Sequence, residues 1–297
     1  MGEQKKGCPR GRGGLGIVSL TDWERMAFYI TFAGYFIAML SYVLHLPFKN
    51  PQLASFASYS SLMGLLGNTA ALILRMMIAG RPPLTNGYEF ILTFAWGIVF
   101  VYLWVERRYK ISIMGAFVLP CAFFLLAFVV FFMSENERVM TSIQPALKSN
   151  WLTFHVATAM FGYGALAISF GIGLLYLVKQ GLVDKGSEGQ LNARIPGLGR
   201  LDFLEYKMIM LGFPLLTLCI ISGAIWANYA WGTYWSWDPK ETWSLVTWII
   251  YAIYLHTRLM YGWKGKLSAW VAVIGFLAVL FTFFGVNYFI AGLHSYA

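Results

Sequence analysis

One stretch of the sequence has an unusual density of aromatic rings. In residues 231–243, which read Trp-Gly-Thr-Tyr-Trp-Ser-Trp-Asp-Pro-Lys-Glu-Thr-Trp, the tryptophans are Trp231, Trp235, Trp237 and Trp243. Indole rings favour the boundary between lipid and water, but four of them exceed what membrane anchoring needs. Because these rings are large, flat and electron-rich, the stretch predicts a platform for a large planar ligand.

The chain also has four histidines, whose neutral imidazoles are the commonest metal ligands in proteins. His155 and His294 lie far apart in the sequence. If the fold brings both to the aromatic stretch, they have the chemistry for bis-axial ligation of haem iron. The alternative for each is a half-exposed histidine at a helix end. The choice depends on the elements that carry them.

Composition places the chain in a membrane. Of 297 residues, 59% are hydrophobic and 12% charged, and the mean hydropathy is +0.63, whereas a soluble domain has about 25% charged residues. The net charge of +9 is therefore a topology signal, with no nucleic-acid partner implied. The three cysteines form no C-x-x-C pair, which argues against a disulfide framework, a metal knuckle or a redox dithiol.

Apolar runs of about 20 residues predict membrane-spanning helices. We expect an all-α polytopic membrane protein with about eight transmembrane helices and the tryptophan stretch between helices 6 and 7. Residues 1–24 are predicted to be a flexible tail, with no signal-peptide pattern, and residues 25–297 one transmembrane domain. The expected spans are roughly 25–46, 53–79, 88–105, 112–133, 151–178, 207–229, 242–262 and 267–290.

Counting cations on the two sides predicts the orientation. Connections on the side of the tryptophan stretch, with the adjoining helix ends, carry five cations: Arg75, Arg81, Arg138, Lys148 and Lys240. The opposite side carries twelve: Lys49, Arg107, Arg108, Lys110, Lys179, Lys185, Arg194, Arg200, Lys207, Arg258, Lys264 and Lys266. The positive-inside rule then places the tryptophan stretch outside the cytoplasm. Cations of the N-terminal tail and Arg25 oppose this assignment.

The same alternation of sides places the histidines. His155 begins the fifth span and His294 follows the eighth, so both are expected on the face of the tryptophan stretch. His256 lies fifteen residues after Glu241, roughly 22 Å below the stretch on a helix. An ionisable group at that depth predicts a function, and a histidine hydrogen-bonded between helices is the alternative. His45 ends the first span and is interpreted as an interface residue.

Polar residues beside the aromatic stretch have helix-capping spacing. Asp238, Pro239 and Glu241 form a capping box with proline in the first helical position, and Asn86 begins a similar pattern. Asp238 and Glu241 are therefore predicted to start a helix rather than to touch a ligand. Lys240, Arg81 and Lys148 could pair with ligand carboxylates, although solvated loop charge is favoured for each, and Arg75 is expected to snorkel.

The pattern Trp231-Gly-x-x-Trp235-x-Trp237-Asp238-x-x-Glu241-x-Trp243 resembles the WWD signature of haem-handling membrane proteins. The surrounding chain resembles the CcsA (ResC) family of system II cytochrome c biogenesis proteins over residues 60–297, most clearly in five further segments. These are Pro83–Glu89, Ser149-Asn150-Trp151 with His155, Gly212–Gly223, Tyr254–Arg258 and Gly292–Ser295.

This resemblance implies a function in cytochrome c biogenesis. Haem b would be exported as cargo and presented on the tryptophans and Asp238, with His155 and His294 as external iron ligands. His256 would serve a haem site within the membrane, whose other ligand comes from a CcsB (ResB) partner. His45, on the same side as His256, is a conceivable internal substitute. With that partner, the chain would mediate attachment of haem to the C-x-x-C-H motif of apocytochrome c. Whether it acts as an enzyme, a holocytochrome c synthase of the haem lyase type in that complex, stays open.

Two other functions remain to be weighed. A haem exporter or chaperone without ligation activity is the alternative, which the eight spans and the near-continuous resemblance argue against. An electron-transferring b-type cytochrome would need histidine pairs on facing helices within the bilayer, and only His256 lies clearly at depth. The expected location is the cell inner (plasma) membrane rather than a thylakoid membrane.

Overall fold

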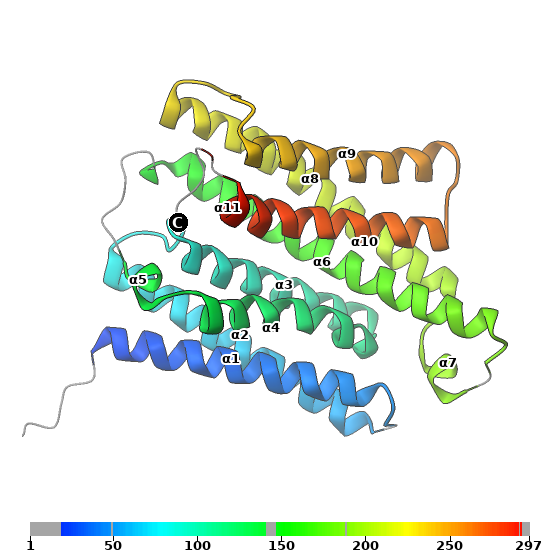
Figure 1. The fold of residues 1–297 in the computed structure, drawn as a ribbon. Helices are drawn as coiled ribbons and strands as arrows, with labels where there is room; N and C mark the ends of the chain where they lie inside the picture. The colour runs from blue at the N-terminus through cyan, green and yellow to red at the C-terminus, as the bar shows by residue number, and fades with distance from the viewer. Residues whose placement is uncertain (1–18, 49, 141–146, 188, 291, 293–297) are drawn as a thin grey trace, which may run out of the picture.

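The computed structural model describes residues 19–48, 50–140, 147–187, 189–290 and 292, and within them the chain is a bundle of long helices with no strand (Figure 1). The long helices are α1 (Leu20–His45), α2 (Pro51–Ala79), α3 (Gly87–Tyr109), α4 (Gly115–Phe132), α6 (Asn150–Asp184), α8 (Leu198–Trp231), α9 (Pro239–Met260) and α10 (Lys266–Leu280). Shorter elements are η1 (Ser112–Met114), α5 (Glu135–Arg138), α7 (Gln190–Arg194), the π-helical turn η3 (Phe281–Gly285) and α11 (Val286–Phe289).

Successive long helices run in alternating directions, and α6 lies at the centre of the bundle. Helix α6 packs along α8 and also contacts α3, α4 and α10 (Figure 1). Helix α1 packs against α2. Helix α9 packs on α8 and α10. We call the end that holds the connection between α8 and α9 the loop end, and the other the opposite end. The loop end also holds the first turns of α3, α6 and α9.

The all-α membrane fold predicted from the sequence is confirmed. Seven of the described helical segments are long and apolar enough to cross a bilayer, and the eighth predicted span, α9, has membrane-crossing length at 22 residues. It is less apolar because a polar stripe follows its inward face at helical spacing. The stripe consists of Lys240, Ser244, Thr247, Tyr251, Tyr254 and Arg258.

Three predicted boundaries were wrong. The first helix starts at Leu20 instead of residue 25, because Ser19 and Asp22 form a capping box ahead of the apolar run. The fifth and sixth spans are 35 and 34 residues long, so each continues beyond the bilayer at the opposite end. The predicted polar connection 179–206 therefore shrinks to the residues around α7, where Lys179 donates a hydrogen bond to the side chain of Asn192.

A buried ion network joins α1, α2 and α3 at the loop end. The Glu89 carboxylate accepts from Arg75 Nε at 2.9 Å and from Arg81 Nη1 at 3.0 Å. Arg75 also lies 3.6 Å from Glu24, and Glu89 is fully buried. Neither arginine is the snorkelling or solvated charge that the sequence suggested. Glu89 accounts for the difference, since its carboxylate turns to the arginines of the preceding helix and loop.

We expect Glu89→Ala to destabilise the bundle by about 3–5 kcal/mol, because it leaves two buried guanidinium groups without their carboxylate. Thermal unfolding of the purified protein in detergent should show a midpoint lowered by several degrees. Glu135→Ala is the matched control, since Glu135 is exposed on α5. Equal midpoints for the two variants would contradict a stabilising role for the network.

Candidate functional site

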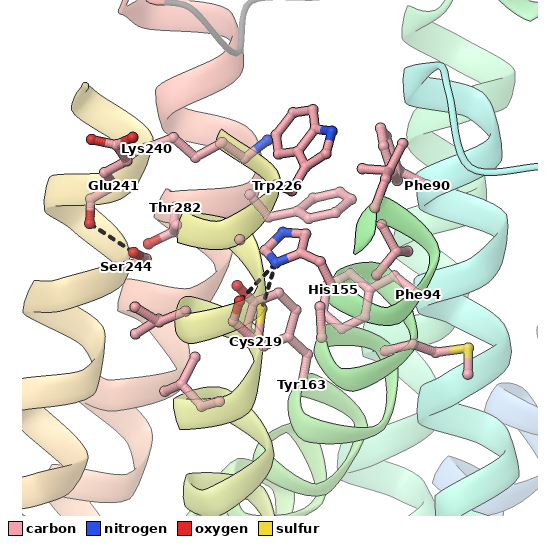
Figure 2. Close-up of a pocket in the computed structure, with 18 of the residues that line it drawn as sticks. Phe90, Phe94, His155, Tyr163, Cys219, Trp226, Lys240, Glu241, Ser244 and Thr282 are labelled. Carbon is pink, nitrogen blue, oxygen red and sulfur yellow. Dashed lines mark hydrogen bonds between the residues drawn. The ribbon is translucent and has the colours of Figure 1, made fainter. Parts of the chain in front are cut away.

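A pocket opens at the loop end between α3, α6, α8, the first turn of α9, η3 and α11 (Figure 2). Its walls are mostly aromatic and aliphatic, and a few polar side chains converge on it. The aromatic walls include Phe90, Phe94, Tyr163, Trp226, Tyr234, Trp235, Phe283 and Phe284. The polar groups include His155, Lys240, Glu241, Ser244, Thr282 and Asn287. Apolar walls with a few placed polar groups are typical of cofactor-sized ligand sites.

His155 is held by the neighbouring helix. Its Nδ1 lies 2.7 Å from the carbonyl oxygen of Cys219 on α8. Since a carbonyl oxygen only accepts, Nδ1 must carry the proton, and the lone pair of the neutral ring is then on Nε2. A histidine that donates one ring N–H to a backbone carbonyl has the orientation typical of metal-ligating imidazoles.

Two residues of α8 shape the place that the imidazole occupies. A Cβ atom on Gly223 would lie 2.8 Å from both Cε1 and Nδ1 of His155, so only glycine leaves room for the ring. Trp226 lies nearly parallel to the imidazole, with ring centroids 6.4 Å apart and an angle of 18°. Cys219, Gly223 and Trp226 follow the i, i+4, i+7 spacing of one helix face. Trp226 was missed from the sequence, where this spacing was the signal for it.

The loop between α8 and α9 is ordered by two carboxylates. Gly232, with φ of 81°, ends α8 in the left-handed conformation. Glu241 then accepts from the backbone N–H groups of Ser236 at 2.8 Å and Asp238 at 3.2 Å, while Asp238 accepts from that of Lys240 at 2.9 Å. The predicted capping box is confirmed. It folds the loop and starts α9.

The four tryptophans of the stretch do not form one plane. Trp235 lines the pocket. The ring of Trp237 is perpendicular to the ring of Trp235, and Trp237 is 68% exposed. Trp231 packs against Trp226 with centroids 4.9 Å apart, and Trp243 packs against Phe281. Trp226 is therefore the indole that stacks beside His155, and Trp235 of the loop lines the same pocket.

The remaining histidines have different surroundings. His294 lies outside the described residues, but a Cβ on Gly292 would lie 2.5 Å from Asp238 Oδ2, so Gly292 lies against the start of α9. His256 is exposed near the opposite end of α9, with its ring 5.8 Å from that of Tyr261. His45 ends α1, on the far side of the bundle from α9 (Figure 1). The structure does not bring His45 and His256 together.

Comparison with known proteins agrees with this architecture. A family model described as "Cytochrome C assembly protein" matches residues 84–294, which include the pocket and the tryptophan loop. The chain is thus a membrane protein of cytochrome c assembly.

The relatives define the family more closely. The chain is 39% identical to the cytochrome c biogenesis protein CcsA of Guillardia theta, over 90% of this chain and 94% of that one. It is 39% identical to CcsA of Mesostigma viride, over 94% and 98%, and to CcsA of Prochlorococcus marinus strain MIT 9301, over 77% and 80%. The chain belongs to the CcsA family of cytochrome c biogenesis proteins.

A solved structure shares the fold. The cytochrome c haem lyase CcmF superimposes with a TM-score of 0.69 at 15% identity, over 93% of this chain. This chain spans 49% of the CcmF chain. At such low identity the match establishes the fold alone.

We expect Gly223→Ala to displace His155, because the new methyl group would overlap the imidazole, and to reduce cytochrome c maturation to a small fraction of its normal yield. The yield of holocytochrome c in cells that depend on the variant measures this effect. Gly181→Ala is the control, since a Cβ there meets no atom within 4 Å. Normal maturation with Gly223→Ala would show that the imidazole position is not important.

Proposed function

We propose that this protein presents haem b, as cargo, in the pocket at the loop end and takes part in its covalent attachment to apocytochrome c. The observation that carries the proposal is the geometry of His155, whose Nδ1 is bonded to the Cys219 carbonyl within aromatic and aliphatic walls. Its Nε2 would ligate the iron on one side. His294, two residues after Gly292, which lies against Asp238, would supply the second imidazole.

The tryptophan loop would cover one face of the haem. In this proposal Trp235 contacts the porphyrin directly, while Trp231, Trp237 and Trp243 support the wall and the mouth of the pocket. Asp238 contributes by holding the loop and the start of α9 in place. The platform therefore depends as much on the cap that folds the loop as on the indoles themselves.

Attachment of haem to protein needs orientation more than acid–base chemistry. The apocytochrome would bring a C-x-x-C-H segment, and its histidine would replace one of the two imidazoles on the iron. Each cysteine thiol then adds across a vinyl group, the sulfur bonding to one vinyl carbon and the proton passing to the other, with no net oxidation. Holding vinyl groups near thiols is a proximity effect, and we expect haem lyase activity only in the complex.

The proposed location is the cell inner membrane, with the tryptophan loop on the extracytoplasmic side. The cation imbalance supports this orientation, since most loop cations lie at the opposite end. A thylakoid membrane is the less favoured location.

His256 fits a second haem site shared with a CcsB-type membrane protein. Its exposure at the opposite end of α9 means that a second ligand to iron would come from outside this bundle. His45 ends α1, which packs on α2 and α4, whereas α9 packs on α8 and α10, so the structure does not favour His45 as that ligand.

Replacing both His155 and His294 by alanine is expected to abolish holocytochrome c formation, because neither outer iron ligand remains. The measurements are haem-stained cytochrome c in cells and the optical spectrum of the purified protein, which should lose bis-histidine haem. His45→Ala is the control and should behave as wild type. A double variant that still matures cytochrome c would overturn the proposal, whereas retained bis-histidine haem would move the ligands elsewhere. Haem retention without thioether formation, in a wild-type complex with its partner, would favour the exporter alternative.

His256→Ala is expected to impair delivery of haem to the outer pocket without impairing the binding of haem there. In cells the variant should mature little cytochrome c, because haem does not reach the outer pocket. The purified variant should bind added haem at the outer pocket as tightly as wild type, since His155 is untouched. A titration followed by absorbance tests this expectation, and an equal loss of binding in both His256→Ala and His155→Ala would contradict two separate sites.

A further inference from the structure

Lys240 places a positive charge in the pocket. It is the second residue of α9, and its side chain extends into the pocket toward the side on which His155 lies (Figure 2). Its Nζ donates a hydrogen bond to Asn287 Oδ1 on α11 at 3.1 Å. Most of the other pocket walls are aromatic or aliphatic, so the ammonium group lies in largely apolar surroundings.

Asp238 attracts this charge electrostatically, but no carboxylate of the described residues forms an ion pair with the Lys240 ammonium group. The ion pairs among those residues involve Glu24, Glu89 and Asp202, all away from Lys240. The nearby acids are engaged by the backbone: Asp238 accepts from the Lys240 N–H, and Glu241 from Ser236 and Asp238. A partly buried cation that lacks a direct ion pair is costly.

The helix itself does not account for the charge. The first turn of a helix carries the positive end of the macrodipole, which favours anions and disfavours cations. Lys240 follows Pro239 directly in this turn, so the helix gains no stability from its charge. The position becomes favourable when an anion enters the pocket, since the ammonium and the helix end then attract it together.

We propose that Lys240, together with Asn287, binds a carboxylate side group of the planar ligand and thereby sets its rotation in the pocket. This inference rests on the proposed function. Iron–imidazole bonds hold a haem at its centre but leave it free to turn about the axis through the two histidines. An ion pair at the rim stops that rotation. It directs the propionate edge toward α9 and α11, and it therefore gives the vinyl groups a fixed direction.

The test compares haem with haem dimethyl ester, in which both carboxylates are blocked, on the full-length protein purified without haem. We expect Lys240→Met to weaken haem binding by about tenfold to a hundredfold, as for loss of one charged hydrogen bond. The dimethyl ester should bind Lys240→Met and wild type equally. Lys148→Met, which removes an exposed cation at the loop end, is the matched control and should leave both titrations unchanged.

Each other outcome has a definite meaning. Equal weakening of both ligands in Lys240→Met would show that the lysine only supports the fold of the pocket and would overturn the inference. Unchanged haem binding would place the carboxylates elsewhere and would also overturn it. Failure of the proposed function gives a different result, because His155→Ala would then bind haem as well as wild type. Lys240→Arg, which keeps the charge, is expected to recover part of the preference for haem over its ester.

Discussion

The rest of this structure depends on one constraint: a polar group inside an apolar bundle must find its partner within the protein. Three of the buried carboxylates show how it is met. Glu89 holds Arg75 and Arg81 at the loop end of α2 and α3. Glu106 accepts from Tyr42 and Ser58 at the opposite end. Asp202 pairs with Arg258 at 2.5 Å where α8 meets α9, also at the opposite end. These clusters fix how neighbouring helices meet, since each joins two or more of them. The loop end of α6, α8 and α9 has no such carboxylate cluster in the described residues, and there the pocket opens.

That difference explains how a rigid bundle has a pocket at its loop end. The long contact between α6 and α8 fixes His155, because its Nδ1 bonds to the Cys219 carbonyl and Gly223 leaves space for the ring. A π-helical turn in the last span adds Thr282, Phe283 and Phe284 to the walls. Such turns insert an extra residue per turn and are frequent at functional sites. The polar groups here are arranged around a space instead of being paired across it.

Sequence patterns were sufficient to predict the helices, the side on which His155 lies and the start of α9. Apolar run length predicted the helices, alternation of sides predicted that His155 shares the loop end with the tryptophans, and capping spacing predicted the start of α9 at Asp238. Apart from the helix boundaries, the errors involve contacts between side chains of different elements or the orientation of rings. Arg75 and Arg81 resembled surface cations because Glu89 was interpreted as part of a cap, and a pairing of side chains across helices leaves no spacing in the sequence. The tryptophans resembled one platform because spacing in a loop does not determine ring planes, and Trp226, in a separate helix, is the ring beside His155.

The two walls of the pocket are held by different kinds of interaction. The histidine wall is part of the helix packing, so it moves only if α6 and α8 separate. The tryptophan wall is a loop of six residues between Gly232 and Pro239, and two carboxylates hold it from one side. Backbone hydrogen bonds to a pair of side chains are far easier to open than a helix interface. If a large ligand enters or leaves from the loop end, the loop is therefore the wall that yields, and His155 keeps its orientation. In the proposed function, holding haem and then releasing it would need this division between a fixed imidazole and a cover that opens.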